Sequence, residues 1–351
     1  MYTESTYRLK AMALWTRFET MLFLAIGIVW VCAFYFLDLD WLRIPWTPLA
    51  LIGTAVAFVI GFQNNAAYGR IWEARKIWGG IVNTSRTFGV FVQDMVTNEH
   101  TQQKMSKEEL GLVRKTLIYR HIGWMTALRH TMRKLKPWEV TSSSRTNSEW
   151  GIKPPERDSI LEEDLIPYLT ANDLEFISDK DNKPTAILYR QSHQLRILKE
   201  KGLIWEFAFL ELEGQIKELF TLQGKSERIK NFPYPRQFAT LNHYFMWVFI
   251  LLLPLALVPQ FADIGKNIAD NYPLVAKFFI WFSIPFYVAV AWVFHTMERI
   301  GRTGENPFEG TANDVPISTI ARGIEIDLRQ NIGETKDEIP DQFPADYNVQ
   351  F

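Results

Sequence analysis

Residues 47–80 read TPLALIGTAVAFVIGFQNNAAYGRIWEARKIWGG, and the organisation of the whole chain follows from this stretch. Its first half, residues 48–62, carries no charge and is long enough to cross much of a lipid bilayer. Its second half contains no proline but is polar, basic and aromatic. Because an α-helix rises about 1.5 Å per residue, one continuous helix over this stretch would leave the hydrocarbon and extend well into water. We therefore predict a membrane-spanning helix with a long polar extension.

Within the apolar half, Thr54, Phe58 and Phe62 recur every four residues and so share one side of a helix. Gly53 and Gly61 leave small surfaces on the other sides for close helix contact. Apolar rings that face a common axis, beside a polar extension, are what a narrow pore constriction needs. The same spacing also fits side chains that pack against a neighbouring helix or lipid, so periodicity alone leaves both interpretations open.

The composition favours a membrane protein whose apolar spans alternate with sizeable polar regions. The 351 residues are 48% hydrophobic and include 13 Trp and 25 Phe, an aromatic load typical of interfacial belts. The mean hydropathy is only -0.07, which requires the polar regions. A net charge of -1 argues against a general nucleic-acid binder, so no nucleic-acid partner is expected. The single cysteine, Cys32, excludes a disulfide within the chain.

Four charge-poor segments are candidate spans, at residues 21–37, 48–62, 237–262 and 278–294. Basic residues flank the start of the first and third spans and the end of the second and fourth, which places these flanks in the cytoplasm by the positive-inside rule. The sequence thus predicts a multi-pass protein of the cell (inner) membrane with both termini cytoplasmic. The basic residues are Arg8, Lys10, Arg17, Arg70, Arg75, Lys76, Arg228, Lys230, Arg236, Arg299 and Arg302.

We predict an all-α fold, because no stretch of the chain shows strand-like alternation of any length. Residues 104–135 and 184–230 have the apolar periodicity of helices, and residues 140–158 form a Ser/Thr/Pro-rich loop. The predicted organisation is an N-terminal segment with the first two spans and the candidate pore helix (1–80), a large cytoplasmic helical region (81–236), the third and fourth spans (237–300), and a cytoplasmic tail (301–351).

The sequence contains none of the motifs that would indicate an enzyme. There is no phosphate-binding Gly-rich loop with Lys, no Ser nucleophile elbow, no His-Glu-x-x-His and no Cys-x-x-Cys, so no catalytic residue and no metal ligand is predicted. His243 and His295 lie at the ends of the third and fourth spans, where each is either a hydrogen-bonded interface residue or a proton sensor. Residues 306–314, NPFEGTAND, are either a plain turn or a set of oxygens for a hard cation.

Residues 61–86, GFQNNAAYGRIWEARKIWGGIVNTSR, resemble the signature of the bestrophin family, including its prokaryotic members. Glu227-Arg228-Ile229 before the third span and Asn306-Pro307-Phe308 after the fourth agree with the same family. The resemblance implies an all-helical homopentameric ion channel in which the second membrane helix of each subunit lines a hydrophobic neck. Matching the neck positions implies Thr54, Phe58 and Phe62 as its lining, with Thr54 where a branched aliphatic residue is common, so that the outer neck is expected to be wider or wetter.

The resemblance implies two further sites. Animal members hold calcium in an acidic clasp after Asn-Pro-Phe, and the matching residues here are a thinned set, Asn306, Glu309 and Asp314. Calcium activation is therefore doubtful for this chain, and no cofactor is expected. A second constriction at the cytosolic exit is expected from a helix before the third span, near Ile204 and Trp205.

These observations predict a passive channel, not an enzyme, whose partners are membrane lipids, permeant monovalent ions and further copies of the chain. Aromatic faces attract cations and aromatic edges attract anions, so the phenylalanines leave the sign of the ion open, with chloride among the candidates. The alternative is a membrane-anchored scaffold or sensor whose cytoplasmic helices bind a partner.

Overall fold

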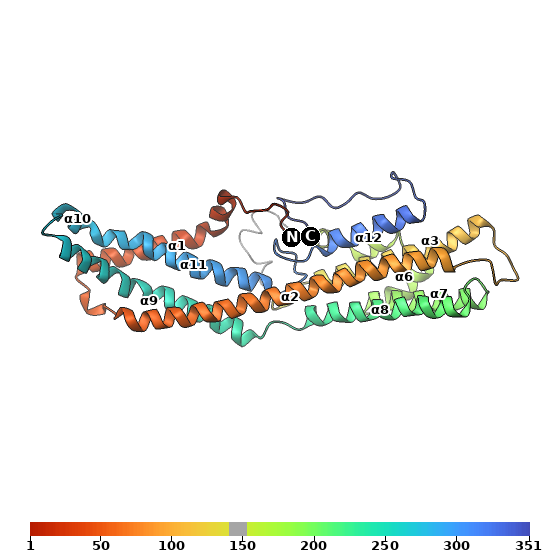
Figure 1. The fold of residues 1–351 in the computed structure, drawn as a ribbon, viewed down its shortest axis with the longest axis horizontal. Helices are drawn as coiled ribbons and strands as arrows, with labels where there is room; N and C mark the ends of the chain where they lie inside the picture. Colours follow the sequence, from red (N-terminus) through yellow and green to blue (C-terminus); the bar gives the residue numbers. More distant parts are fainter. Residues whose placement is uncertain (140–152) are drawn as a thin grey trace. The chain divides into compact units, whose positions relative to one another are not determined.

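The computed structural model describes residues 1–139 and 153–351 and is helical almost throughout (Figure 1). Two isolated bridges, Tyr2 with Val349 and Asp346 with Val349, are the only β-structure in these ranges. The all-α prediction is thereby confirmed, although most of the loop predicted over residues 140–158 lies outside the described residues. The chain divides into two compact units, which we call the membrane unit (Glu4–Gly69 and Tyr234–Glu305) and the second unit (Met1–Thr3, Arg70–Pro233 and Asn306–Phe351).

Four helical segments of the described chain are long and apolar enough to cross a membrane, which confirms the four predicted spans. They are Leu9–Leu37, Trp46–Met95, Arg236–Ile268 and Pro273–Gly304. Each is longer than the charge-free run that predicted it, because polar residues at the ends continue the helix. The third contains Pro254 and Pro259, which a bundled membrane helix tolerates.

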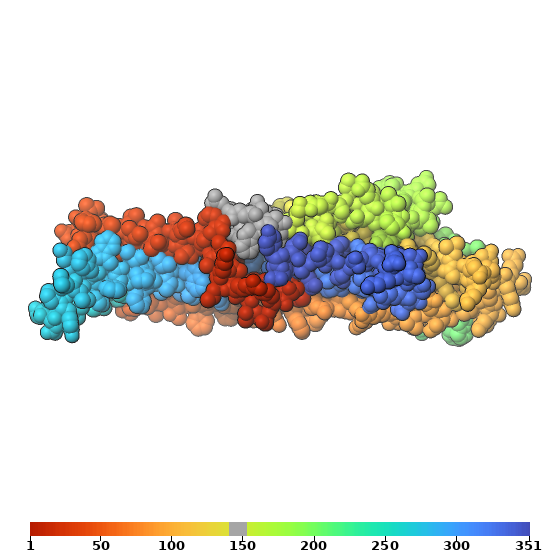
Figure 2. Space-filling model, turned by 90° about the horizontal axis from the view of Figure 1, so that it is seen from above, coloured from red at the N-terminus to blue at the C-terminus, as the bar shows by residue number. Residues whose placement is uncertain are grey.

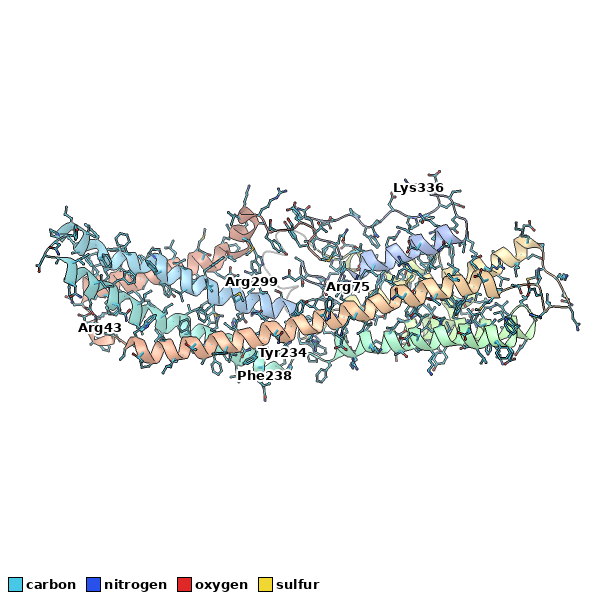
Figure 3. All side chains as sticks on the ribbon, in the orientation of Figure 1. Arg43, Arg75, Tyr234, Phe238, Arg299 and Lys336 are labelled. Carbon is cyan, nitrogen blue, oxygen red and sulfur yellow. The ribbon has the colours of Figure 1, made fainter. Side chains whose placement is uncertain are left out.

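The membrane unit contains helices α1 (Leu9–Leu37), α9 (Arg236–Ile268), α10 (Pro273–Phe278) and α11 (Ser283–Gly304), with the short turns η1 (Asp40–Leu42) and η4 (Phe279–Phe282) and the first part of α2 (Trp46–Met95). Helices α1 and α11 lie side by side in Figures 1 and 2. Gly27 permits this approach, since a Cβ there would stand 3.1 Å from Cδ1 of Tyr287. Arg299 of α11, labelled in Figure 3, donates to Glu19 of α1 over 3.0 Å.

The second unit contains α3 (Lys107–Arg133), α5 (Leu161–Leu165), α6 (Ala171–Ser178), α7 (Lys183–Glu200), α8 (Glu206–Asn231) and α12 (Ile317–Asn331), with the turn η3 (Pro155–Arg157) and the rest of α2. Helix α3 is buried along most of its length and begins with a capping box between Ser106 and Glu109. The helix predicted over residues 104–135 is thus confirmed with slightly shorter bounds.

The helical region predicted over residues 184–230 is two helices, α7 and α8, rather than one. The break is at Gly202, whose φ of +71° lies in the left-handed region, and a Cβ at this position would come within 2.5 Å of the His100 carbonyl oxygen. Only glycine fits both the backbone angle and the close approach. Apolar periodicity continues across the break, so the sequence pattern did not reveal it.

Both ends of the chain belong to the second unit and pack within it. The amide of Thr319 in α12 donates to the carbonyl of Phe351 over 2.7 Å, and the Phe351 side chain is buried. The amide of Tyr2 donates to the carbonyl of Ala312 over 2.8 Å, beside the loop that follows Asn306. The four-segment organisation predicted from the sequence stays a prediction, whereas the contacts group the tail with α2, α3, α7 and α8 in one unit.

Candidate functional site

Helix α2 has a buried side and an exposed side within the membrane unit. Its buried residues are Leu49, Gly53, Val56, Ile60, Gln63 and Ala67. Successive residues of an α-helix turn by about 100°, so these six lie on one side. Thr54, Phe58 and Phe62 lie on the opposite side, and the two phenylalanine side chains are 65% and 70% exposed.

On the buried side of α2, the stretch from Gly53 to Ile60 packs through apolar atoms alone. Val56 and Ile60 belong to one buried cluster with Phe249 and Ile250 of α9. Gly53 brings the two helices together, because a Cβ there would lie 2.7 Å from Cε2 of Phe249. Such contacts hold the helices close but have little directional preference.

At Gln63 and Asn64, the contacts of α2 are polar hydrogen bonds, which depend on direction. The Gln63 amide nitrogen donates to Oε1 of Glu305 over 2.7 Å, and its oxygen accepts from Nδ2 of Asn242 over 3.1 Å. Asn64 donates to the carbonyl of Met297 over 3.1 Å. We call Gln63, Asn242 and Glu305 the amide tether; it links α2 to α9 and to the end of α11.

The Thr54 hydroxyl donates to the carbonyl of Ala50, one turn earlier in the same helix, over 2.9 Å. This bond satisfies the hydroxyl proton inside α2, so Thr54 needs no donor contact to another element. The position of Thr54, Phe58 and Phe62 on the exposed side is compatible with a neck, and their role in one stays a prediction.

His243 and His295 lie in the membrane unit, and the geometry around His243 favours a hydrogen-bonded structural residue. Trp247 Nε1 donates to Nε2 of His243 over 3.1 Å, and an indole can only donate. The ring proton of neutral His243 is therefore on Nδ1, which lies 3.2 Å from Oε1 of Glu298. His295 packs edge-on against Phe23 at a ring separation of 5.6 Å.

In the loop that follows α11, the Asp314 carboxylate is bound by the protein itself. Asp314 accepts at Oδ1 from the amides of Phe308 (2.9 Å) and Val315 (2.6 Å), and at Oδ2 from the amide of Gly310 (2.8 Å). Arg133 also donates to Oδ2 over 3.3 Å. This carboxylate is thus already used by the loop backbone and by a guanidinium, which a calcium ion would have to displace.

The other two residues of the predicted clasp are also buried. Asn306 and Glu309 both lie in the protein interior, and Arg157 donates to the Glu309 carbonyl over 3.1 Å. Within the described part of the chain, no three His, Cys, Asp or Glu side chains are arranged to hold a metal ion. The expectation that this chain holds no calcium stays a prediction, supported by the use of the Asp314 carboxylate within the loop.

The two residues predicted for a cytosolic aperture point to different environments. Ile204 is 1% exposed and belongs to the core of the second unit, whereas Trp205 is 47% exposed at the start of α8. The Trp205 ring lies at a tilt against the ring of Phe207, with 5.1 Å between the ring centroids. An aperture at this point stays a prediction, and only Trp205 of the predicted pair has the exposure to line one.

Sequence reasoning missed the amide tether. Gln63 stands inside the quoted stretch, directly after Phe62, and Glu305 directly precedes Asn306-Pro307-Phe308. Amide and acid side chains at the ends of charge-poor spans are a usable signal, because polar groups at membrane depth need partners. The sequence does not say which of the available groups become those partners.

The fold and this site define a four-span, all-helical membrane protein with an aromatic face on its second span. The family profile described as Bacterial/Fungal Bestrophin protein matches residues 11–330. The chain therefore belongs to the bacterial and fungal bestrophin family, which confirms the resemblance of residues 61–86.

The relatives cover most of the chain. The voltage-dependent anion channel-forming protein RSc3414 of Ralstonia nicotianae is 27% identical over 296 residues, 82% of this chain and 78% of that protein. The voltage-dependent anion channel-forming protein YneE of Escherichia coli is 24% identical over 304 residues, 86% of this chain and 81% of that protein. A bacterial bestrophin homologue from Klebsiella pneumoniae has a similar crystal structure, with a TM-score of 0.69 over 91% of this chain and 99% of that one; at 19% identity this supports the fold alone.

Proposed function

We propose that several copies of this chain form an anion channel whose neck is lined by Thr54, Phe58 and Phe62. The observation that carries the proposal is the exposure of two phenylalanines on the side of α2 that faces away from the packed side. One stripe on one helix cannot enclose a pore, so the neck requires a symmetric ring of copies. The family resemblance supports five.

The neck acts by excluding water from a narrow apolar passage. Rings of phenylalanine oppose the entry of ions when the passage is dry, and ions pass when it widens or becomes wet. The relatives named as anion channel-forming proteins support an anion as the permeant ion, and the positive edges of the rings are the part of phenylalanine that attracts one. We take a monovalent anion, with chloride as the test ion.

The chain is proposed to lie in the inner membrane with both termini cytoplasmic. The support is the distribution of basic residues around the spans. Arg43, in the turn between the first two spans, is ion-paired with Asp263 and donates to the carbonyl of Pro259. Because its charge is paired, Arg43 is only weak evidence for a cytoplasmic location of this turn.

Chloride efflux from liposomes that contain only the purified protein tests the proposal. We expect efflux from the unmodified protein and a larger efflux, or altered gating, with Phe58→Ala, because the smaller side chain widens the apolar ring. Val29→Ala, an exposed apolar position on α1, is the matched control and should leave efflux unchanged. Silent liposomes would instead support a scaffold or sensor, and an unaltered Phe58→Ala variant would remove Phe58 from any constriction.

Particle images of the purified protein viewed along the membrane normal test the subunit number. A ring of five would support the proposed neck, and the exposed faces of α2 should then meet at its centre. A monomer, or a ring in which α2 lies at the periphery, would contradict it.

A further inference from the structure

The amide tether lies directly behind the aromatic face of α2. Gln63 follows Phe62 in the chain, yet Gln63 is buried while Phe62 is exposed. Both polar atoms of the Gln63 amide are used, the nitrogen by Glu305 and the oxygen by Asn242. Gln63, Asn242 and Glu305 are each at most 4% exposed, so water does not compete for these bonds.

Glu305 connects this amide to a cation. Its second carboxylate oxygen lies 3.6 Å from Nη2 of Arg236, at the start of α9. The neighbouring Asn64 binds the Met297 carbonyl of α11, and it comes so close to this helix that a Cβ at Gly301 would lie 2.6 Å from its Oδ1. Helix α2 is therefore hydrogen-bonded to α9 and α11 through the two residues that directly follow Phe62.

These bonds constrain α2 in a way that its apolar contacts do not. Hydrogen bonds weaken steeply when their angle changes, whereas the contacts of Val56 and Ile60 tolerate some rotation or sliding. A turn of α2 about its own axis would break the bonds of Gln63 before it broke the apolar contact. The same turn would move Phe58 and Phe62 away from the direction in which they now point.

We propose that Glu305 is a positioning residue for the neck: through Gln63 it holds α2 in the rotation that presents Phe62, and release of this bond favours the open neck. The inference rests on the proposed channel function and adds to it the group that holds the constriction in place. Glu305 itself does not touch the permeant ion.

The test is chloride current through the purified protein in planar bilayers. Gln63→Glu places a second carboxylate against Glu305 and removes the donor, and we expect the current at a fixed voltage to rise about tenfold, the effect of losing one hydrogen bond to a charged group; a fall in current would contradict the proposal. The exchanged pair, Gln63→Glu with Glu305→Gln, restores a donor opposite a carboxylate and should return the current to near that of the unmodified protein. Gln237→Glu, the same change at an exposed glutamine of α9, is the control and should have no effect.

A second measurement separates positioning from a general effect on folding. In a Phe62→Ala background the neck has lost the side chain that the tether positions, so Gln63→Glu should change the current little further. An equal change in both backgrounds would overturn the inference, as would a normal current in Gln63→Glu alone. If Gln63→Glu does not yield a folded protein, Asn242→Ala removes one of the two bonds, and its effect should likewise vanish with Phe62→Ala. A silent unmodified protein would refute the channel itself, which is a different result.

Discussion

In the membrane unit, the large side chains of Phe58 and Phe62 are mostly exposed, whereas in the second unit Phe88 and Trp124 are completely buried. The second unit has one large core of buried aromatic and aliphatic side chains, although Trp205 and Phe207 remain exposed. The membrane unit also has a buried apolar cluster, but it buries polar groups at the amide tether and at Glu298 and exposes apolar side chains such as Phe58. The comparison shows that the largest aromatic side chains of the second unit's core are buried, whereas Phe58 and Phe62 of the membrane unit are left for a lipid or a further copy to cover.

The largest effect that follows from this comparison concerns a buried ion pair of the second unit. Arg120 binds Asp173 over 2.9 Å, and both side chains are buried. Burial alone would raise the pKa of Asp173, but the guanidiniums of Arg120 and Arg190 hold it below its usual value. Arg120→Met leaves a buried carboxylate without its main partner, and we expect a loss of about 3–5 kcal/mol in the free energy of unfolding, measured by denaturant titration.

The matched control is Arg86→Met. Arg86 pairs with Asp327 over 2.6 Å, but the two side chains are 58% and 38% exposed, so the expected loss is at most about 1 kcal/mol. Equal losses for the two variants would show that burial does not set the strength of these ion pairs.

A smaller effect concerns pH. His121 is stacked on Phe88 and contacts the tilted ring of Trp124, and neither of its ring nitrogens has a hydrogen-bond partner. Burial lowers the pKa of His121 from 6.5 to about 3. Between these values the unfolded chain binds a proton that the folded chain does not, so stability is present above pH 6.5 and is lost as the pH falls toward 3. Lowering the pH from 7 to 5 should cost about 2 kcal/mol.

Unfolding curves at the two pH values measure this loss. His121→Leu, which keeps an apolar side chain in the stack, should remove most of the difference. A pH dependence of the same size in the leucine variant would assign the effect to other groups.

In the membrane unit, two glycines of α2 distinguish the packed side from the open side. Gly53→Ala forces the Phe249 ring to move, and overpacking of this kind costs about 1–3 kcal/mol. Gly61→Ala meets nothing within 4 Å and should stabilise the helix by about 0.5–1 kcal/mol. Thermal unfolding of the two detergent-solubilised variants should therefore shift in opposite directions, and a shift in the same direction would contradict the assignment of the two sides.

The smallest expected effect concerns the stability of the neck variants. Because Phe58 is mostly exposed within a single chain, Phe58→Ala should change the stability of that chain by no more than about 0.5 kcal/mol. Trp124→Ala, in the core of the second unit, should cost about 3–5 kcal/mol. Thermal unfolding of dissociated chains measures both, and a large loss from Phe58→Ala would show that this side chain packs within the chain.

Hydropathy and helical spacing were enough to predict the four spans, the helical class and the common side of Thr54, Phe58 and Phe62. These features are local, because a span needs only a run of apolar residues and a stripe needs only a period of 3.6. Local patterns could not predict that Gly202 breaks the helical region at residues 184–230, since the need for glycine comes from the His100 carbonyl, about a hundred positions earlier.

The sequence also could not predict which polar side chains bind each other. Gln63 and Glu305 are 242 positions apart, and no local sequence pattern around either residue indicates that the two bind each other. Ile204 and Trp205 are neighbours in the chain, yet one is in the core and the other at the surface. Sequence alone established which segments are apolar and which residues share a side, since each depends on a few neighbouring positions. Which side of α2 is buried, and which polar groups meet there, follows from the packing of α9 and α11 against it.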